Sequence, residues 1–121
     1  MIEQLRHSDE LKSFIFILNQ IFEIERKVSK IKEANSIDRN IQRLKECFED
    51  GFAEKKYSLT YHNPIGEKFD ETRTDCEASI AGVSTENLII TEVIKPIIRI
   101  KMDGRTYIVQ RAIVVVEEQN S

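Results

Sequence analysis

The sequence has few of the residues that build catalytic centres, metal sites or disulfide frameworks. It contains two cysteines, two histidines, four glycines and no tryptophan among 121 residues. Cys47 and Cys76 fit no metal-binding or redox spacing, and neither His7 nor His62 has a second ligand at zinc-site spacing. The isolated glycines make no phosphate-binding loop. The sequence therefore predicts no catalytic residue, no cofactor and no metal site, and hence no enzyme.

Charge and hydrophobicity narrow the classes of partner. The 18 Lys and Arg residues against 21 Asp and Glu residues give a formal net charge of −3, without the basic field that binds nucleic-acid phosphates. The longest apolar runs, Phe14–Leu18 among them, are far shorter than the ~20 residues of a membrane span. The sequence also begins without a signal-peptide pattern. We therefore expect a cytoplasmic protein that binds neither nucleic acid nor membrane.

The first half of the sequence has the hydrophobic period of two helices. One helix is expected from about Ser8 to Glu33, with Ser8 as its N-cap, and a second follows Ser36, which is well suited to cap it. Gly51 is expected to mark fraying or a bend rather than a sharp end, because the helix-compatible run 53–56 follows it. The sequence therefore predicts a helix pair.

The apolar stripe on these helices is wide, and the β-strand part of the chain is too small to cover both helices. Two such pairs, one from each of two chains, would cover each other as a four-helix bundle. The sequence thus predicts a homodimer. The residues expected in its interface are Leu11, Phe14, Leu18, Ile21, Ile41, Leu44 and Phe48.

After Lys56 apolar and polar residues alternate, as they do in half-buried strands. Strands are expected at 57–61, 76–80, 88–94, 98–102, 106–109 and 112–116. Pro96 is expected at a sheet edge or corner, and Asp103-Gly104 is a strong hairpin signal. The predicted fold class is therefore α+β. A helical dimerisation region (1–56) precedes a small all-β domain of short strands for partner binding (57–121).

The turn at Asp103-Gly104-Arg105 admits two interpretations. Arg105 is either an ordinary solvated residue beside the turn or a rigidly presented cation suited to an acidic patch on a protein partner. Other polar clusters point less clearly to a functional site. Glu67 and Asp70, for example, fall in a polar loop, which is typical of turn and cap residues rather than of shielded catalytic carboxylates.

The order of these motifs resembles the GrpE family of nucleotide exchange factors, which serve DnaK-type heat-shock chaperones. The similarity covers about residues 36–117. Its segments are the strand 57–61, the hydrophobic-Asp pair Phe69-Asp70, the strands 75–80 and 89–95, the hairpin Met102-Asp103-Gly104-Arg105-Thr106 and the closing strand 112–116. Pro96-Ile97-Ile98 replaces the family's Gly-Tyr before the hairpin. The resemblance implies a shortened form without the family's long N-terminal helix.

The resemblance also implies a function. A GrpE-like homodimer would engage the nucleotide-binding domain of a DnaK-type chaperone and separate its lobes, so that ADP leaves. Arg105 matches the family's hairpin arginine and would belong to the contact surface, together with Asp103, Gly104 and Thr106. Exchange needs no catalytic group, because a ligand that prefers the open chaperone weakens ADP binding by the same factor. The alternative is a GrpE-like adaptor or scaffold that dimerises and binds a protein partner without exchange activity.

Overall fold

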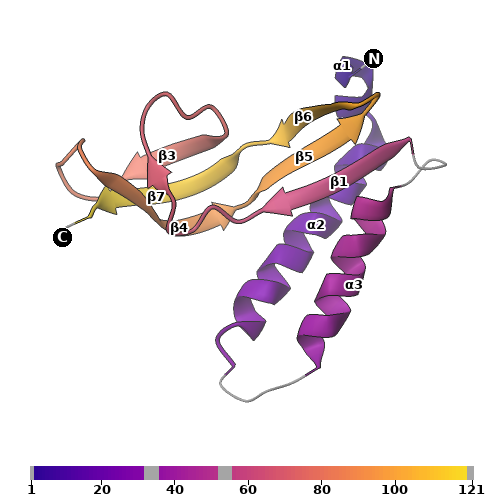
Figure 1. Cartoon of the computed structure of the whole chain (residues 1–121), viewed down its shortest axis with the longest axis horizontal. Helices are drawn as coiled ribbons and strands as arrows, with labels where there is room; N and C mark the ends of the chain where they lie inside the picture. The colour runs from indigo at the N-terminus through magenta and orange to yellow at the C-terminus, as the bar shows by residue number, and fades with distance from the viewer. Residues whose placement is uncertain (1, 32–35, 52–55, 120–121) are drawn as a thin grey trace. The chain divides into compact units, whose positions relative to one another are not determined.

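The computed structural model describes residues 2–31, 36–51 and 56–119 and has an α+β fold (Figure 1). Within these ranges three helices precede seven strands. Contacts divide the chain into two compact units, Met1–Thr60 with Arg99–Tyr107, and Tyr61–Ile98 with Ile108–Ser121. The first unit holds all the helices, and the second holds the whole of a four-stranded sheet.

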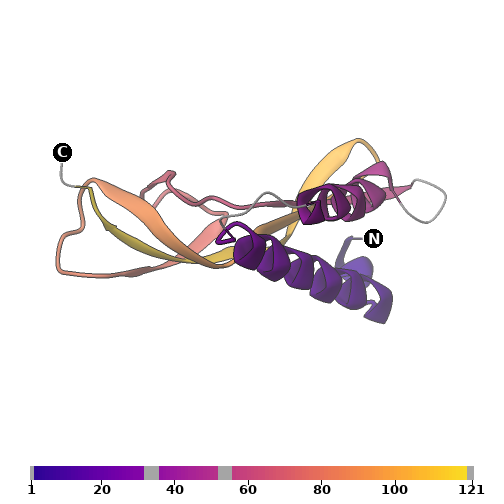
Figure 2. The same ribbon diagram turned by 90° about the horizontal axis from the view of Figure 1, so that it is seen from below.

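The helical part consists of α1 (Ile2–Arg6), α2 (Asp9–Val28) and α3 (Ile37–Asp50). The short α1 was not predicted. The two longer helices lie side by side and run in opposite directions in both ribbon views (Figures 1 and 2). Phe14 of α2 meets Phe48 of α3 edge to face, with ring centroids 5.7 Å apart. The predicted helix pair is therefore present within one chain.

Ser8 sets the start of α2, as predicted. Its hydroxyl oxygen accepts a hydrogen bond from the Leu11 amide at 3.2 Å and donates one to the Leu5 carbonyl at 2.8 Å. Asp9 and Glu10 follow in the first turn, where negative charge complements the helix dipole. The helix ends at Val28, earlier than the predicted Glu33. The Ser29 amide donates there to the Glu25 and Lys27 carbonyls, which closes the last turn, and a turn follows.

Two predictions about α3 are wrong. Ser36 makes no side-chain cap hydrogen bond. Its backbone, at φ −92° and ψ 3°, lies outside the extended conformation from which a serine side chain caps a helix. Gly51 ends the helix instead of bending it, because its φ of 107° cannot continue an α-helix and favours glycine. Residues 52–55 of the expected continuation lie outside the described residues.

Replacing Ser8 with Ala should lower the free energy of unfolding by about 1 kcal/mol, because the Leu11 amide would lose its cap. Urea unfolding followed by circular dichroism measures the change. Ser13→Ala, at an exposed position within the same helix, is the control and should change stability by less than about 0.5 kcal/mol. Equal stability of Ser8→Ala and the unmodified protein would contradict the role given to this cap.

A three-stranded sheet has the strand order β1-β5-β6, with β1 (Tyr57–His62), β5 (Ile97–Met102) and β6 (Arg105–Gln110). In Figure 1 the central β5 runs opposite to both neighbours. Leu59 and Ile100 have no exposed surface, which confirms the inward face expected from the alternating pattern. The predicted strands are thus present, each longer by one or two residues.

The four-stranded sheet has the order β2-β4-β7-β3. Its strands are β2 (Lys68–Phe69), β3 (Cys76–Ile80), β4 (Leu88–Lys95) and β7 (Ala112–Glu118). The central β7 pairs antiparallel with β4 and parallel with β3. Neither β2 nor the parallel pair was predicted. Pro96 is buried where the chain passes from β4 to β5, that is, from a strand of one sheet to a strand of the other.

Candidate partner-binding site

The β5–β6 hairpin ends in a rigid two-residue turn. Asp103 and Gly104 have φ values of 53° and 73°, the left-handed conformation at both central positions that a type I′ hairpin turn requires. Met102, just before the turn, is buried and anchors the tip of the strand. Arg105 and Thr106, just after it, are exposed. The predicted hairpin is confirmed, and its turn holds these two side chains at a defined place on the surface.

Arg105 is available to a partner. Among the residues that the structure describes, its guanidinium forms no hydrogen bond and no ion pair, so its five N–H donors face solvent. Other arginines are used within the chain: Arg73 binds Glu67 and Asp75, and Arg111 binds Glu77 and two backbone carbonyls. Arg105 is therefore not needed for any contact described within the fold.

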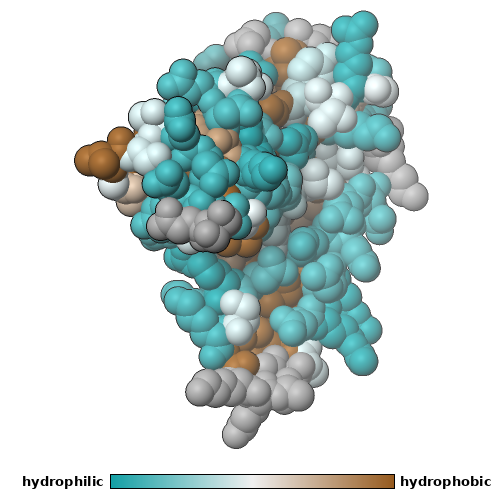
Figure 3. All heavy atoms as spheres, turned by 60° about the vertical axis from the view of Figure 1, so that its left-hand side comes forward, coloured by the Kyte–Doolittle hydropathy of each residue, from teal (hydrophilic) through white to brown (hydrophobic). Residues whose placement is uncertain are grey.

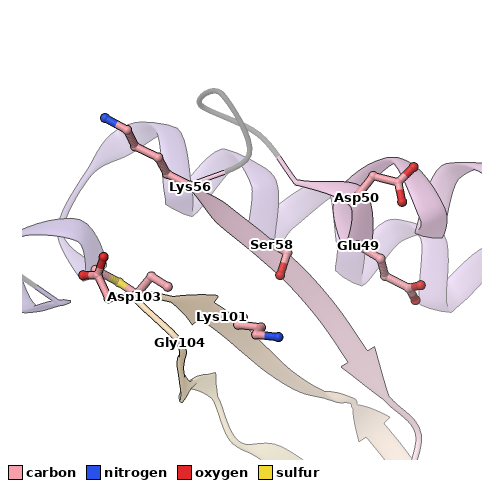
Figure 4. A pocket seen from close by; sticks show the side chains of 8 residues that line it. Glu49, Asp50, Lys56, Ser58, Lys101, Asp103 and Gly104 are labelled. Carbon is pink, nitrogen blue, oxygen red and sulfur yellow. The ribbon is translucent and has the colours of Figure 1, made fainter.

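A shallow polar cavity of about 330 Å³ lies beside the hairpin within the first unit. Figure 4 shows Glu49 and Asp50 projecting from α3, Ser58 and Lys101 on the neighbouring strands β1 and β5, and the turn at Asp103-Gly104. Lys56 and Met102 complete its lining. Glu49, Asp50 and Lys101 were not predicted as neighbours of the turn, because they come from separate segments and carry no motif.

The cavity carries charged groups of both signs at the surface. Its carboxylates, from Glu49, Asp50 and Asp103, and its ammonium groups, from Lys56 and Lys101, all belong to exposed residues. No group of three or more potential metal ligands occurs among the described residues. The hairpin and cavity together present charges of both signs that can make ion pairs across an interface.

The seven predicted dimer-interface residues differ in how far the single chain buries them. Leu11, Leu18, Ile21 and Ile41 are buried within the single chain, and Phe14 and Phe48 are half-buried against each other. Leu44 alone among the seven stays largely exposed, at 48%. Most of the predicted residues are therefore covered within one chain.

Several apolar side chains remain exposed on the helix pair, among them Leu44 of the predicted set and Phe16, which is 64% exposed. Ile17 and Ile24 of α2 are 42% and 47% exposed, and Ile37 and Leu44 of α3 are 42% and 48% exposed. The members of each pair lie two helical turns apart, so at about 100° per residue each pair forms one line along its own helix. We call these four residues the exposed helical face. The lower part of Figure 3, which contains α2 and α3, shows a band of hydrophobic side chains between hydrophilic flanks.

A polar cluster in the second unit fixes the loop that leads to β3. Arg73 donates to Glu67 and Asp75 at 2.7 Å each and to the Lys68 carbonyl at 2.9 Å. His62 lies 2.5 Å from the other oxygen of Glu67. Burial acts to raise the pKa of Glu67, but hydrogen bonds from Arg73 and His62 outweigh it, so this pKa lies below its ordinary value. The pKa of Asp75 is lowered in the same way, with Arg73 as the main partner.

Replacing Arg73 with Ala should destabilise the protein by about 1–2 kcal/mol at neutral pH, because two carboxylates lose a charged hydrogen-bond donor that is only partly screened. Both carboxylates have lowered pKa values in the fold, so their contribution is full above about pH 4.5 and is lost as pH falls further. Urea unfolding between pH 7 and pH 3 should therefore show a smaller acid-induced loss in the variant. Arg39→Ala is the control, and an equal loss in all three proteins would contradict the prediction.

Comparison of the chain with models of protein families, with curated proteins and with solved structures gives no match in any of the three. Across the described residues, no helix has both the length and the apolar character needed to cross a membrane. Because these comparisons give no match, the motif order, the hairpin and the exposed helical face are the observations that bear on function.

Proposed function

We propose that the protein is a GrpE-like co-chaperone of the cytoplasm: a homodimeric nucleotide exchange factor that binds the nucleotide-binding domain of a DnaK-type chaperone and promotes ADP release. The observation that carries the proposal is Arg105, exposed beside a rigid type I′ turn and without a partner among the described residues. The motif order around this turn resembles that of the GrpE family. Asp103, Gly104 and Thr106 complete the proposed contact.

The chemistry of Arg105 fits this role. A guanidinium can bind a carboxylate through two parallel hydrogen bonds, which fixes orientation as well as adding affinity. The tight turn removes most of the backbone freedom that would otherwise be lost on binding, so less of the interaction energy is spent on ordering. A hairpin of this kind suits an acidic patch on the nucleotide-binding domain.

The exposed helical face supports the homodimer. Apolar side chains at Ile17, Ile24, Ile37 and Leu44 would be covered if two helix pairs packed face to face as a four-helix bundle. The geometry moves the proposed interface away from Leu18, Ile21 and Ile41, which are buried within one chain. Leu44 belongs to both the predicted and the exposed sets.

Exchange then follows from linked equilibria. A factor that binds the open, nucleotide-free chaperone more tightly than the closed ADP form lowers ADP affinity by the same ratio. Measured couplings of this type are about 5–150-fold. No proton transfer or covalent step is involved, so the mechanism uses only binding surfaces.

Binding to the isolated nucleotide-binding domains of the host's DnaK-type chaperones tests the proposal. We expect calorimetry to give at least about fivefold tighter binding to the nucleotide-free domain than to the ADP-saturated domain. Equal affinity for both forms would support the GrpE-like adaptor instead. Absence of binding to every such domain, by protein shown to be folded, would contradict both functions.

A further inference from the structure

A second cavity, of about 410 Å³, lies at one end of the four-stranded sheet. Phe69, Ile80 and Leu88 supply its apolar walls, and Thr85 and Asn87 lie at its side. Asp70 and Glu71, in the loop after β2, place two carboxylates at the same cavity. All of these residues belong to the second unit, so the cavity is separate from the hairpin site.

Neither Asp70 nor Glu71 forms an ion pair with a described residue. The Thr72 hydroxyl and amide both donate to Asp70, and these hydrogen bonds hold the pKa of Asp70 below its ordinary value. The charge of Arg73 also acts on the Asp70 carboxylate and helps to lower its pKa, but without a direct ion pair. Arg73, in the same loop, gives its hydrogen bonds to Glu67 and Asp75. The cavity therefore combines apolar walls with negative charge.

The adjoining strand β3 is an edge strand whose outer edge is only partly covered. The Asp75 carbonyl accepts from the Ala112 amide, and the Ala81 amide donates to Val116, so these odd-numbered residues face β7. The backbone groups of the even-numbered residues between them consequently point outward. Arg111 donates to the outward carbonyls of Thr74 and Cys76 at 3.0 and 2.8 Å.

The capping by Arg111 stops after Cys76. The outward backbone groups of Ala78 and Ile80 therefore stay at the uncovered part of the edge, and Ile80 is at the same time a wall of the cavity. Uncovered edges accept extended peptides, because the unpaired amides and carbonyls form a template for another strand. Ile80 thus belongs to both the uncovered edge of β3 and the wall of the cavity.

We propose that this site binds an extended segment of a partner protein, which adds as a strand beside β3 and places a lysine or arginine side chain in the cavity. The apolar stem of such a side chain would cover Ile80, Phe69 and Leu88, and its cationic head would meet Asp70 and Glu71. The two carboxylates would repel an acidic side chain. A purely apolar side chain would take water away from the carboxylates without giving them a cation to pair with. This inference goes beyond exchange activity and does not depend on the hairpin.

Chemical-shift titration of the full-length, ¹⁵N-labelled protein tests the site. The probe is a capped valine- and threonine-rich pentapeptide with a central lysine, and the matched peptide has norleucine at that position. We expect the lysine peptide to shift the amides of Ala78, Ile80 and Asn87 and to bind about tenfold more tightly than the norleucine peptide. N-methylation of the lysine peptide at the amides that face β3 should weaken its binding relative to the unmethylated lysine peptide.

Glu71→Lys should weaken the lysine peptide by about tenfold or more. Glu86→Lys makes the same charge change at an exposed residue of the neighbouring loop, outside the cavity lining, and should leave binding unchanged. Arg105→Ala should also leave it unchanged, which separates this site from the hairpin. Equal binding of the lysine and norleucine peptides, equal effects of the two glutamate variants, or absence of shifts at β3 would each overturn the proposal.

Discussion

Changing both Ile17 and Ile24 to Glu should convert the protein from a dimer to a folded monomer. These side chains are exposed on one chain, so the substitutions disturb no buried packing within it. In the proposed bundle each dimer would lose four buried apolar side chains and gain four charges at one interface. Covering the remaining exposed part of each side chain contributes about 0.7 kcal/mol or more, so the dissociation constant should rise about a hundredfold. Sedimentation measures the assembly, and circular dichroism measures the helix content.

The matched variant changes Leu18 and Ile21, the neighbours of Ile17 and Ile24 along the helix, to Asp. Both are buried within the chain, and an unpaired buried charge costs about 3–5 kcal/mol, a large part of the stability of a small domain. We expect loss of helical signal rather than a folded monomer. An intact dimer carrying Glu at positions 17 and 24 would contradict the proposed interface.

Reversing the charge of Arg105 should strongly weaken partner binding. Residues at the centre of an interface often contribute 2 kcal/mol or more, and arginine is frequent among them. We expect the Arg105→Glu variant to bind the nucleotide-free domain about thirtyfold more weakly or worse. The fold should be unaffected, because Arg105 is exposed and binds none of the described residues.

Arg43→Glu is the control for this change. Arg43 is an exposed arginine of α3 away from the exposed helical face, and its reversal alters the net charge by the same amount. Calorimetry with the same domain should give nearly unchanged affinity for this variant. Equal losses in the two variants would show that only overall charge matters and would contradict a specific hairpin contact.

Features encoded by a few adjacent residues could be predicted from the sequence. The Ser8 cap and the Asp103-Gly104 turn each depend on local chemistry, and each is present in the fold. Gly51 shows the limit of such reasoning. The helix-forming residues after it favoured continuation, but its left-handed backbone ends the helix.

Features that join distant segments could not be predicted. β2 has two residues, too few for an alternating pattern, and the parallel pairing of β3 with β7 joins Cys76 to Ala112. The apolar stripe of the first helix was recognised, but its period does not tell which residues face α3 and which stay exposed. Leu18 and Ile17 are adjacent in the sequence and have opposite exposure.

The same limit applies to the candidate site. The hairpin and Arg105 could be identified from a five-residue motif. Glu49 and Asp50 belong to no motif, and the fold brings them beside the hairpin. The cavity at Ile80 likewise combines β2, β3 and β4, which no local pattern connects.

The release rate of a fluorescent ADP analogue from the host's DnaK-type chaperones tests the proposed function most directly. Stopped-flow traces would be recorded with and without this protein, over a range of its concentration. We expect release to accelerate with concentration to a plateau, and the acceleration to be much weaker with the Arg105→Glu variant. Unchanged release from every such chaperone, by protein shown to be folded and dimeric, would contradict the proposed exchange activity.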